Sequence, residues 1–315
     1  MSQMTVHRGA AANRWKRLKK DLYRYRYMYL LLLPGIFFLL IFRYVPIYGI
    51  QLAFKKYSIR GGIMGSRWIG WSNFQYLFME PEFWNAFNNT LIISLMKTFI
   101  GFPIPVILAI LLNEMRSKKY QRVVQTVLTF PHFLSWVVLS GIMFTLLSST
   151  GAINNLIALM GGGRINFLTN KHGFRWLLVW SQIWKESGWS AIIYLATITG
   201  IDQSLYEAAT IDGANRWDRM VHVTWPGLRP VVITMLILNV GSIMEAGYMQ
   251  VLNLYNPAVY STADILDTYV YRISFQKATD FGVSTAVSLF KGVTNCVLLF
   301  VANFIAKRFG EQGIS

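Results

Sequence analysis

The sequence predicts an all-α fold, a polytopic membrane protein with six transmembrane helices. One reason is composition, since hydrophobic residues make up 54% and aromatic residues 15% of the 315 residues, and the mean hydropathy is +0.39. A soluble domain of this length is usually less apolar. The other reason is that the apolar residues gather in separate runs, each close to the roughly 20 residues that an α-helix needs to cross a bilayer.

Six runs have this length, and each is expected to form one span. They cover residues 29–50, 89–112, 124–147, 174–197, 231–254 and 281–306. A basic segment precedes the first run, as in a signal peptide, but the run is long and no small-residue cleavage site closes it, so an uncleaved span is expected. The chain then divides into a basic N-terminal segment (1–28), a membrane domain (29–306) and a C-terminal tail (307–315).

The distribution of lysine and arginine predicts the orientation of the chain. Cytoplasmic loops of membrane proteins are enriched in these two residues. The segments on the N-terminal side of the membrane hold the denser clusters, which lie within 14–26, 116–122, 216–229 and 307–308. Both termini are therefore expected in the cytoplasm. The formal net charge of +16 fits loops beside membrane lipid, and nucleic acid is not expected as a partner.

A polar segment at residues 206–227, called the elbow below, separates the fourth and fifth runs on the expected cytoplasmic side. Its alanine-rich part at 206–211 predicts a short helix. Asp212-Gly213 predicts a turn in which the glycine takes the left-handed conformation. A second, amphipathic helix is expected at 214–223, where apolar and charged side chains fall on opposite faces.

Pro226 and Pro230 are expected to end this second helix and to start the fifth span, because proline suits a first helical turn and not a helix interior. Two interpretations of the elbow follow from the pattern. It is either a helix at the lipid surface, anchored by Trp217 and Trp225, or a helix that binds a protein partner. Its three acidic residues interrupt the basic face that a lipid-bound helix favours.

The elbow also contains several residue types at fixed separations. Glu207-Ala208-Ala209 is followed after three residues by Gly213 and after nine more by Val223-Thr224-Trp225-Pro226. This spacing resembles the EAA loop of permease subunits in binding-protein-dependent ABC importers. The chain departs from the usual motif by having Val223 in place of isoleucine and Trp225 in place of leucine, and it keeps Pro226.

Other segments resemble the carbohydrate permeases of this family. The sequence WIGWSNF at 68–74 resembles the external segment before the second span. The sequences LYNP at 254–257 and DTYVYR at 267–272 resemble the branch that imports complex oligosaccharides. The resemblance therefore implies an oligosaccharide cargo.

The resemblance implies that the elbow is a coupling helix, seated in a groove of a separate ATP-binding subunit. The residues to which it assigns this contact are Glu207, Ala208, Ala209, Asp212, Gly213, Ala214, Arg216 and Trp217. It also implies a location in a bacterial cytoplasmic (inner) membrane. The implied partners are a second homologous permease subunit, two ATP-binding subunits and an external solute-binding protein.

The sequence contains no motif for catalysis. No G-x-x-x-x-G-K-[ST] phosphate loop occurs, and Gly161-Gly162-Gly163-Arg164 lacks the lysine and the following helix. The four histidines have no metal-ligand spacing, and no nucleophile or paired-carboxylate motif is present. The chain is therefore expected to be a non-catalytic subunit with no cofactor or metal of its own, while ATP and Mg are bound by the partner ATPase subunits.

Charged residues inside the expected spans mark a candidate pathway, because each costs about 2.5–3.5 kcal/mol to insert and usually faces a cavity or a partner. At a rise of about 1.5 Å per residue, several of them share one depth. With aromatic residues at neighbouring heights, the candidates are Lys97, Trp180, Trp184, Lys185, Glu186, Glu245, Tyr248 and Lys291. Glu245 and Lys291 are expected to interact or to line a common cavity. Salt bridges between spans, without any role in a pathway, explain charges inside the spans equally well.

The sequence thus favours a permease subunit of an ATP-driven oligosaccharide importer, and the lysines within its spans favour an acidic cargo. A self-contained secondary transporter of a small polar solute also fits six spans with buried charges. A membrane-embedded glycosyltransferase or other enzyme fits less well, because no paired-acid or metal cluster is present.

Overall fold

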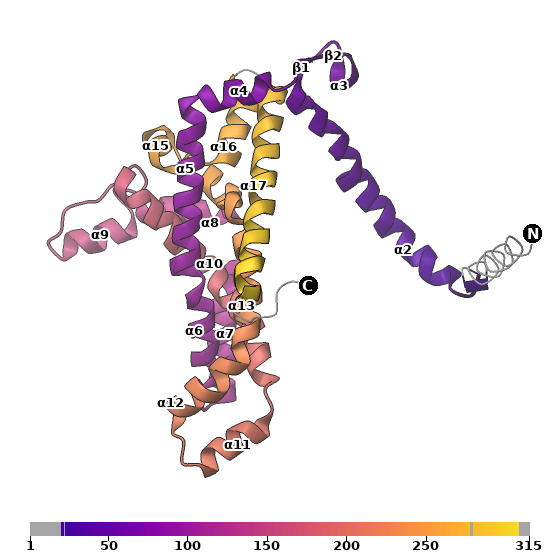
Figure 1. The fold of residues 1–315 in the computed structure, drawn as a ribbon. Coiled ribbons are helices and arrows are strands. Elements are labelled where there is room, and N and C mark those ends of the chain that lie inside the picture. The colour runs from indigo at the N-terminus through magenta and orange to yellow at the C-terminus, as the bar shows by residue number, and fades with distance from the viewer. Residues whose placement is uncertain (1–19, 22, 278–279, 309–315) are drawn as a thin grey trace, which may run out of the picture.

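The computed structural model describes residues 20–21, 23–277 and 280–308. They form an elongated helical bundle with a small β-hairpin at one end and the elbow at the other (Figure 1). The predictions for residues 1–19 and 309–315, which include most of the basic N-terminal segment and of the C-terminal tail, lie outside the described residues.

The first apolar run leaves the bundle as a separate arm. It consists of α2 (Arg26–Leu39), the π-turn η1 (Leu40–Tyr44) and the 3-10 helix η2 (Val45–Phe54). In Figure 1 it slopes away from the other helices. The apolar side chains of α2 and η1 are exposed, and within the described chain nothing covers them. The end of the arm, η2, packs against α17, and its Ala53 is buried.

The hairpin end follows the arm. It consists of β1 (Lys55–Ser58), α3 (Gly62–Gly65), the antiparallel partner strand β2 (Ser66–Trp68) and α4 (Ser72–Met79). The buried amide of Asn73 donates to the carbonyls of Ala53 at 2.9 Å and Lys55 at 3.1 Å. These bonds satisfy two backbone acceptors where the arm ends, so α4 is held against the base of the hairpin.

Four long helical stretches form the bundle. They are α5 (Pro81–Met96) with η3 (Lys97–Gly101) and α6 (Pro103–Asn113), then α10 (Lys171–Thr199), α13 (Trp225–Gly241) and α17 (Phe281–Arg308). α10 packs along α6, and α13 packs along α17. Where α6, α10 and α13 meet, Val106, Ala191 and Leu228 are buried in one apolar cluster. Burial of such side chains joins the four stretches into one body.

The third apolar run, predicted as one span at 124–147, is interrupted. Its residues lie in α7 (Lys118–Thr129), η4 (Phe130–Phe133) and α8 (Trp136–Leu147), with α9 (Ala152–Leu159) after it. Pro131 cannot donate a backbone hydrogen bond, and the carbonyl of His132 accepts a bond from Lys185 Nζ at 2.6 Å. A side chain from α10 thus provides the hydrogen-bond donor for the backbone carbonyl at this break. Hydropathy does not reveal such a contact between helices.

The fifth run, predicted as one span at 231–254, is interrupted as well. After α13 the chain passes through η6 (Ile243–Glu245), and Ala246 and Gly247 then take left-handed φ angles of 43° and 86°. The remaining elements before α17 are α14 (Tyr248–Leu254), η7 (Pro257–Val259), α15 (Tyr260–Ala263), α16 (Leu266–Tyr271) and η8 (Arg272–Lys277). At this break Ala246 is buried, and its carbonyl accepts a hydrogen bond from Lys97 Nζ at 2.7 Å, as non-helical backbone in a membrane protein requires.

Three prolines in the long helices follow π-turns at the same distance. Pro46 stands two residues after η1, Pro103 two after η3 and Pro226 two after η5 (Met220–Thr224). A wider turn alters the hydrogen-bond ladder at the position where proline has no N–H. The expectation that Pro226 and Pro230 end the second elbow helix was therefore wrong, because α12 (Arg216–Arg219), η5 and α13 form one continuous helix.

Five helical stretches in the described residues are long and apolar enough to cross a membrane. They are Arg26–Phe54, Pro81–Asn113, Trp136–Leu159, Arg216–Gly241 and Phe281–Arg308. α10 has 29 residues, but Arg175, Lys185 and Glu186 lower its apolar character. The predicted all-helical membrane fold is confirmed, whereas the number of six spans stays a prediction.

Candidate functional site

The elbow begins with α11 (Gln203–Ile211), whose N-cap is Asp202. The carboxylate of Asp202 accepts the backbone N–H of Ser204 at 2.9 Å, and this bond lowers the pKa of Asp202 below its usual value. At the other end, Gly213 has a φ of 83°, and the N–H of Ala214 donates to the carbonyl of Ala209 at 2.9 Å. The predicted glycine turn is therefore present.

The second part of the elbow is held by side-chain caps. Asn215 accepts the N–H groups of Trp217 and Asp218, and Asp218 accepts the N–H of Asn215 in return, which is a capping box. Two side-chain bonds connect the two parts of the elbow: Arg219 to Thr210 at 3.1 Å, and Tyr206 to Thr224 at 3.0 Å. The elbow is thus a pre-formed unit.

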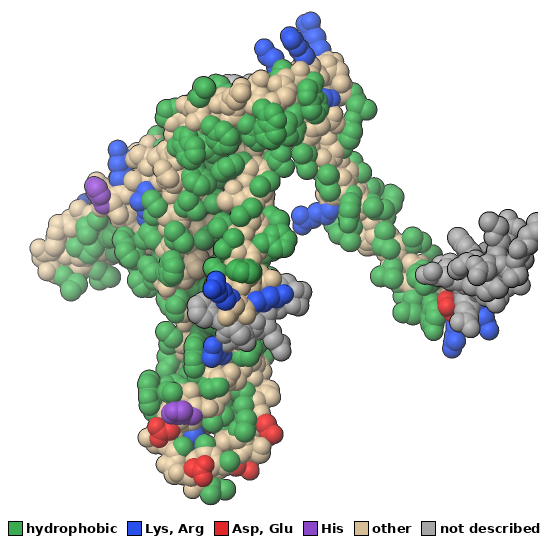
Figure 2. All heavy atoms as spheres, in the orientation of Figure 1, with side chains coloured by type: hydrophobic (Ala, Val, Ile, Leu, Met, Phe, Trp, Pro, Cys, Tyr) green, Lys and Arg blue, Asp and Glu red, His purple; other side chains and the backbone are tan. Residues whose placement is uncertain are grey.

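Most residues predicted to contact an ATPase lie on the outside of this unit. Glu207, Ala208, Asp212, Gly213, Arg216 and Trp217 are exposed, and Ala209 and Ala214 are half-buried. Two large apolar side chains stand out, Ile211 at 86% and Trp217 at 67% exposure. Figure 2 shows acidic side chains gathered at the same end of the molecule. An exposed surface of apolar and acidic groups at one tip is typical of a protein-binding site.

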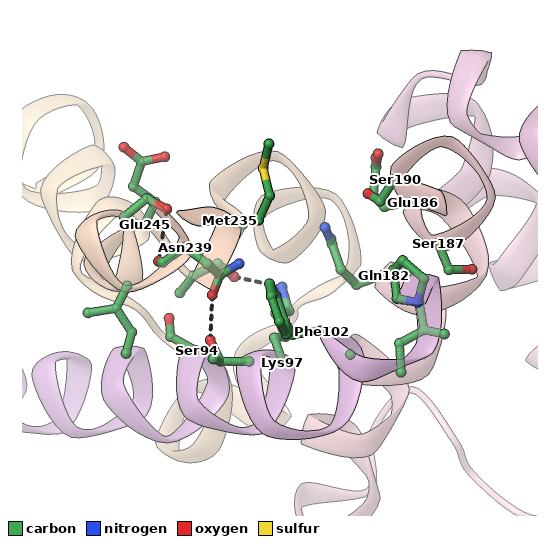
Figure 3. A pocket seen from close by; sticks show the side chains of 18 of the residues that line it. Ser94, Lys97, Phe102, Gln182, Glu186, Ser187, Ser190, Met235, Asn239 and Glu245 are labelled. Carbon is green, nitrogen blue, oxygen red and sulfur yellow. Dashed lines mark hydrogen bonds between the residues drawn. The ribbon is translucent and has the colours of Figure 1, made fainter. Parts of the chain in front are cut away.

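A cavity of about 680 Å³, called the central cavity below, lies between α5 with η3, α10, α13 and the segments from η6 to α17. Five of the predicted pathway residues line it together: Lys97, Glu186, Glu245, Tyr248 and Lys291. Figure 3 shows Ser94 and Lys97 on one helix, Glu186 and Ser190 on a second, and Met235 and Asn239 on a third. The cavity has the size of a ligand site and is lined by many polar groups.

The remaining candidates do not line the central cavity. Lys185 is buried beside it, with Nζ 3.3 Å from the Glu186 carboxylate. Trp180 and Trp184 are about half exposed, at 55% and 50%, on the outer side of α10. These two tryptophans are therefore placed for contact with lipid or a partner and not with a solute in the cavity.

Ion pairs hold most of the charges in and beside the cavity. Lys291 Nζ lies 2.7 Å from Asp267 Oδ1, so Lys291 pairs with Asp267 and not, as one of the two expected alternatives had it, with Glu245. The other alternative was a common cavity, and Glu245 and Lys291 do line the same cavity. The carboxylate of Glu186 contacts Lys185 Nζ at 3.3 Å and His132 Nδ1 at 2.7 Å. His132 in turn stacks on Trp189 with ring centroids 4.6 Å apart.

Several polar residues that line the cavity were missed by the sequence analysis, among them Ser94, Thr98, Gln182, Asn239 and Asp267. Uncharged polar residues within an apolar run change its hydropathy little, so they attract no notice. A usable signal was present in the spacing of Ser94, Lys97, Thr98 and Gly101, which fall on one helical face.

Comparisons with known proteins give a consistent result. Residues 101–311 match the family model for the binding-protein-dependent transport system inner membrane component. The chain is similar to the polygalacturonan/rhamnogalacturonan transport system permease protein YteP of Bacillus subtilis, with 45% identity over 95% of this chain and 93% of the relative. It is also similar to protein LplB of the same organism, with 43% identity over 94% and 92%.

A solved structure is similar over nearly the whole chain. It is that of a bacterial alginate ABC transporter in complex with an alginate pentasaccharide-bound periplasmic protein. The match has a TM-score of 0.86 and 39% identity, and it covers 95% of this chain and 100% of the other. The arrangement of helices described above is thus that of a known transport protein.

Proposed function

The chain belongs to the family of binding-protein-dependent transport system inner membrane components, and from this premise we propose that it forms, with a second permease subunit, the pathway for oligosaccharide uptake. It is a permease of the ABC importer type. The observation that carries the proposal is the central cavity. Its volume of about 680 Å³ lies within the range of ligand pockets, about 300–1,000 Å³.

The lining of the central cavity suits a sugar. Serine, glutamine, asparagine and tyrosine side chains from different helices face it, and such groups exchange hydrogen bonds with hydroxyl groups. Charged groups at this depth of a membrane protein are expensive unless they serve a cavity or a partner. An apolar solute would leave these polar groups unpaired, so a polar cargo is favoured.

Similarity to named relatives supports an acidic oligosaccharide as the cargo. One relative is named for polygalacturonan and rhamnogalacturonan, and one similar structure is described as importing the acidic polysaccharide alginate. We extend this cargo class to the present chain. Lys97 in the cavity wall is a suitable partner for a sugar carboxylate.

The arm supports a second permease subunit. α2 carries apolar side chains around its circumference, and in the described chain they are not covered. Lipid alone accounts for such a surface, but the slope of the arm away from its own bundle (Figure 1) suits packing against a neighbouring bundle. The pathway would then lie between the two bundles, with the central cavity contributed by this chain.

The elbow supports ATP-binding partners. Its exposed residues, its helix caps and its EAA-type spacing suit docking into a groove of a separate subunit that binds ATP and Mg, with one such subunit for each permease chain. This chain itself would carry no catalytic group. The elbow end then faces the cytoplasm of the bacterial cell, both termini lie on that side, and the hairpin end faces the external solute-binding protein.

Reconstitution in liposomes tests the proposal. The chain is co-purified with a second permease subunit, an ATPase subunit and a solute-binding protein, and uptake of a labelled oligosaccharide is followed. Uptake is expected to require ATP and all four components, and to persist when ion gradients are collapsed. Accumulation by the chain alone, driven by a proton or sodium gradient, would establish the secondary transporter instead.

A further inference from the structure

Three lysines lie in or beside the central cavity, and they differ in their partners. Lys185 is bonded to Glu186 and to the carbonyl of His132. Lys291 is bonded to both oxygens of Asp267 at 2.7 and 2.8 Å. Two of the three positive charges are therefore already compensated by carboxylates.

Lys97 has only uncharged partners. Its Nζ donates to the carbonyl of Ala246 at 2.7 Å and to the amide oxygen of Gln250. Gln250 is fully buried and donates to α10 in turn, so its position is fixed. An ammonium group has three donors, which leaves one N–H of Lys97 for a group in the cavity. Among the described residues, Lys97 forms no ion pair.

Ser94 adds a second donor one helical turn away on the same wall. Ser94 is 5% exposed, lines the cavity, and its Oγ has no hydrogen-bond partner in the described structure. By contrast, Thr90 of the same helix and Ser181 of α10 each donate to the carbonyl four residues earlier. A buried hydroxyl without a partner is unfavourable, and a bound solute would relieve it.

We propose that Ser94 and Lys97 together bind a carboxylate of the oligosaccharide, and that Lys97 is the residue by which the pathway distinguishes acidic from neutral sugars. This inference rests on the proposed function. Residues at i and i+3 lie about 5–6 Å apart on one helix face, a spacing at which the serine hydroxyl and the ammonium reach the two oxygens of one carboxylate. Lys185 and Lys291 are already held by their own carboxylates.

The surroundings of Lys97 keep this position open. Gly247 takes a left-handed conformation, and a Cβ placed on it would lie 2.7 Å from Lys97 Nζ, so a larger residue there would displace the ammonium. Glu245 lines the same cavity, and in Figure 3 its carboxylate points away from Ser94 and Lys97. Glu245 would repel a sugar carboxylate at its own end and accept sugar hydroxyls, which fixes the orientation of the cargo.

The test compares two cargoes of equal length in the complete reconstituted complex. One is an oligogalacturonide, and the other is the same oligosaccharide with its carboxyl groups reduced to alcohols. The variants are Lys97→Gln, Lys97→Arg and Ser94→Ala, with Lys56→Gln on the exposed hairpin as a matched control. Because one binding protein loads all complexes, its own selectivity cancels when each variant is compared with the parent.

In Lys97→Gln the ratio of acidic to neutral uptake is expected to fall about tenfold or more, the range for loss of a hydrogen bond to a charged group. Lys97→Arg should restore most of the ratio, Ser94→Ala should lower it about threefold, and Lys56→Gln should keep it. An equal fall for both cargoes, or an unchanged ratio, would show that Lys97 only supports the Ala246 backbone and would overturn the inference. If the parent imports neither cargo, the proposed function itself fails.

Discussion

Lys291 Nζ lies 2.7 and 2.8 Å from the two carboxylate oxygens of Asp267, so α17 and α16 are joined at the wall of the central cavity. Both side chains are mostly buried, at 18% and 25% exposure. Glu245 was the sequence-based candidate partner of Lys291, and it lines the same cavity. The two-oxygen contact identifies Asp267 as the residue that compensates the charge of Lys291.

A double-mutant cycle of Asp267→Asn and Lys291→Met is expected to give a coupling of about 1–3 kcal/mol in the stability of the purified complex. Each single variant leaves one charge without its partner, whereas the double variant removes both. Thermal unfolding in detergent provides the measurement. The cycle of Glu245→Gln with Lys291→Met is the matched control, with a coupling near zero. A larger coupling in the control would reassign the partner of Lys291.

The sequence predicts the long, uninterrupted helices better than the broken ones. The run 174–197 lies within α10 and the run 281–306 within α17, because apolar length and local caps suffice to specify them. The runs 124–147 and 231–254 contain breaks whose carbonyls are satisfied by Lys185 and Lys97 from other helices. A break of this kind depends on tertiary contacts, which hydropathy does not contain.

The candidate site shows the same division. The turn at Gly213 and the helices beside it follow from local residue types, and the structure has them. The partners of the buried charges do not follow, since Asp267 and Lys291 meet only when α16 packs against α17. The sequence predicts the depth of a charged residue along its span, but not the direction in which its side chain points around the helix axis. Lys97 faces the cavity, whereas Trp184 faces outward.

Arg272 is expected to be essential for the stability of the hairpin end. Its Nη2 donates to Asp264 at 2.7 Å and to Glu82 at 3.2 Å. Arg272 and Asp264 are buried, while the Glu82 side chain is 45% exposed. Removing one partner of a buried pair costs about 3–5 kcal/mol, so Arg272→Met and Asp264→Asn should lower the yield and thermal stability of the complex strongly.

Glu82→Gln provides the control for Arg272, because an exposed ion pair contributes only about 0–1 kcal/mol. Its melting temperature should stay close to that of the parent. Equal destabilisation by Glu82→Gln and Asp264→Asn would contradict the assignment of the buried pair as the stabilising one.

Gly188 is expected to tolerate no side chain. A Cβ at this position of α10 would lie 2.1 Å from the carbonyl oxygen of Leu128 in α7, and neither backbone can move without shifting a helix. Gly188→Ala should therefore destabilise the protein by about 1–3 kcal/mol through overpacking. The control is Gly292→Ala in α17, where a Cβ meets nothing within 4 Å and alanine favours the helix. Thermal unfolding that ranks the two variants in the opposite order would refute the prediction.

Two substitutions in the elbow are expected to uncouple ATP hydrolysis from transport. Gly213→Pro is incompatible with a φ of 83°, since proline fixes φ near −65°, and it removes the N–H that donates to Thr210 at 3.1 Å. Glu207→Lys reverses an exposed charge at the tip. In reconstituted complexes, both variants should insert normally, yet lose transport together with ATPase binding or with the stimulation of hydrolysis by loaded binding protein.

The matched control for Glu207→Lys is Arg60→Glu, a charge reversal on an exposed residue at the hairpin end, which should leave ATPase binding intact because it lies at the opposite end of the bundle. A cysteine replacing Ala214, half-buried beside the turn, should crosslink to a cysteine in the groove of the ATPase subunit. If Gly213→Pro and Glu207→Lys complexes assemble, hydrolyse and transport like the parent, or if the cysteine reacts only with lipid-phase probes, the elbow is an interfacial helix and not a coupling element.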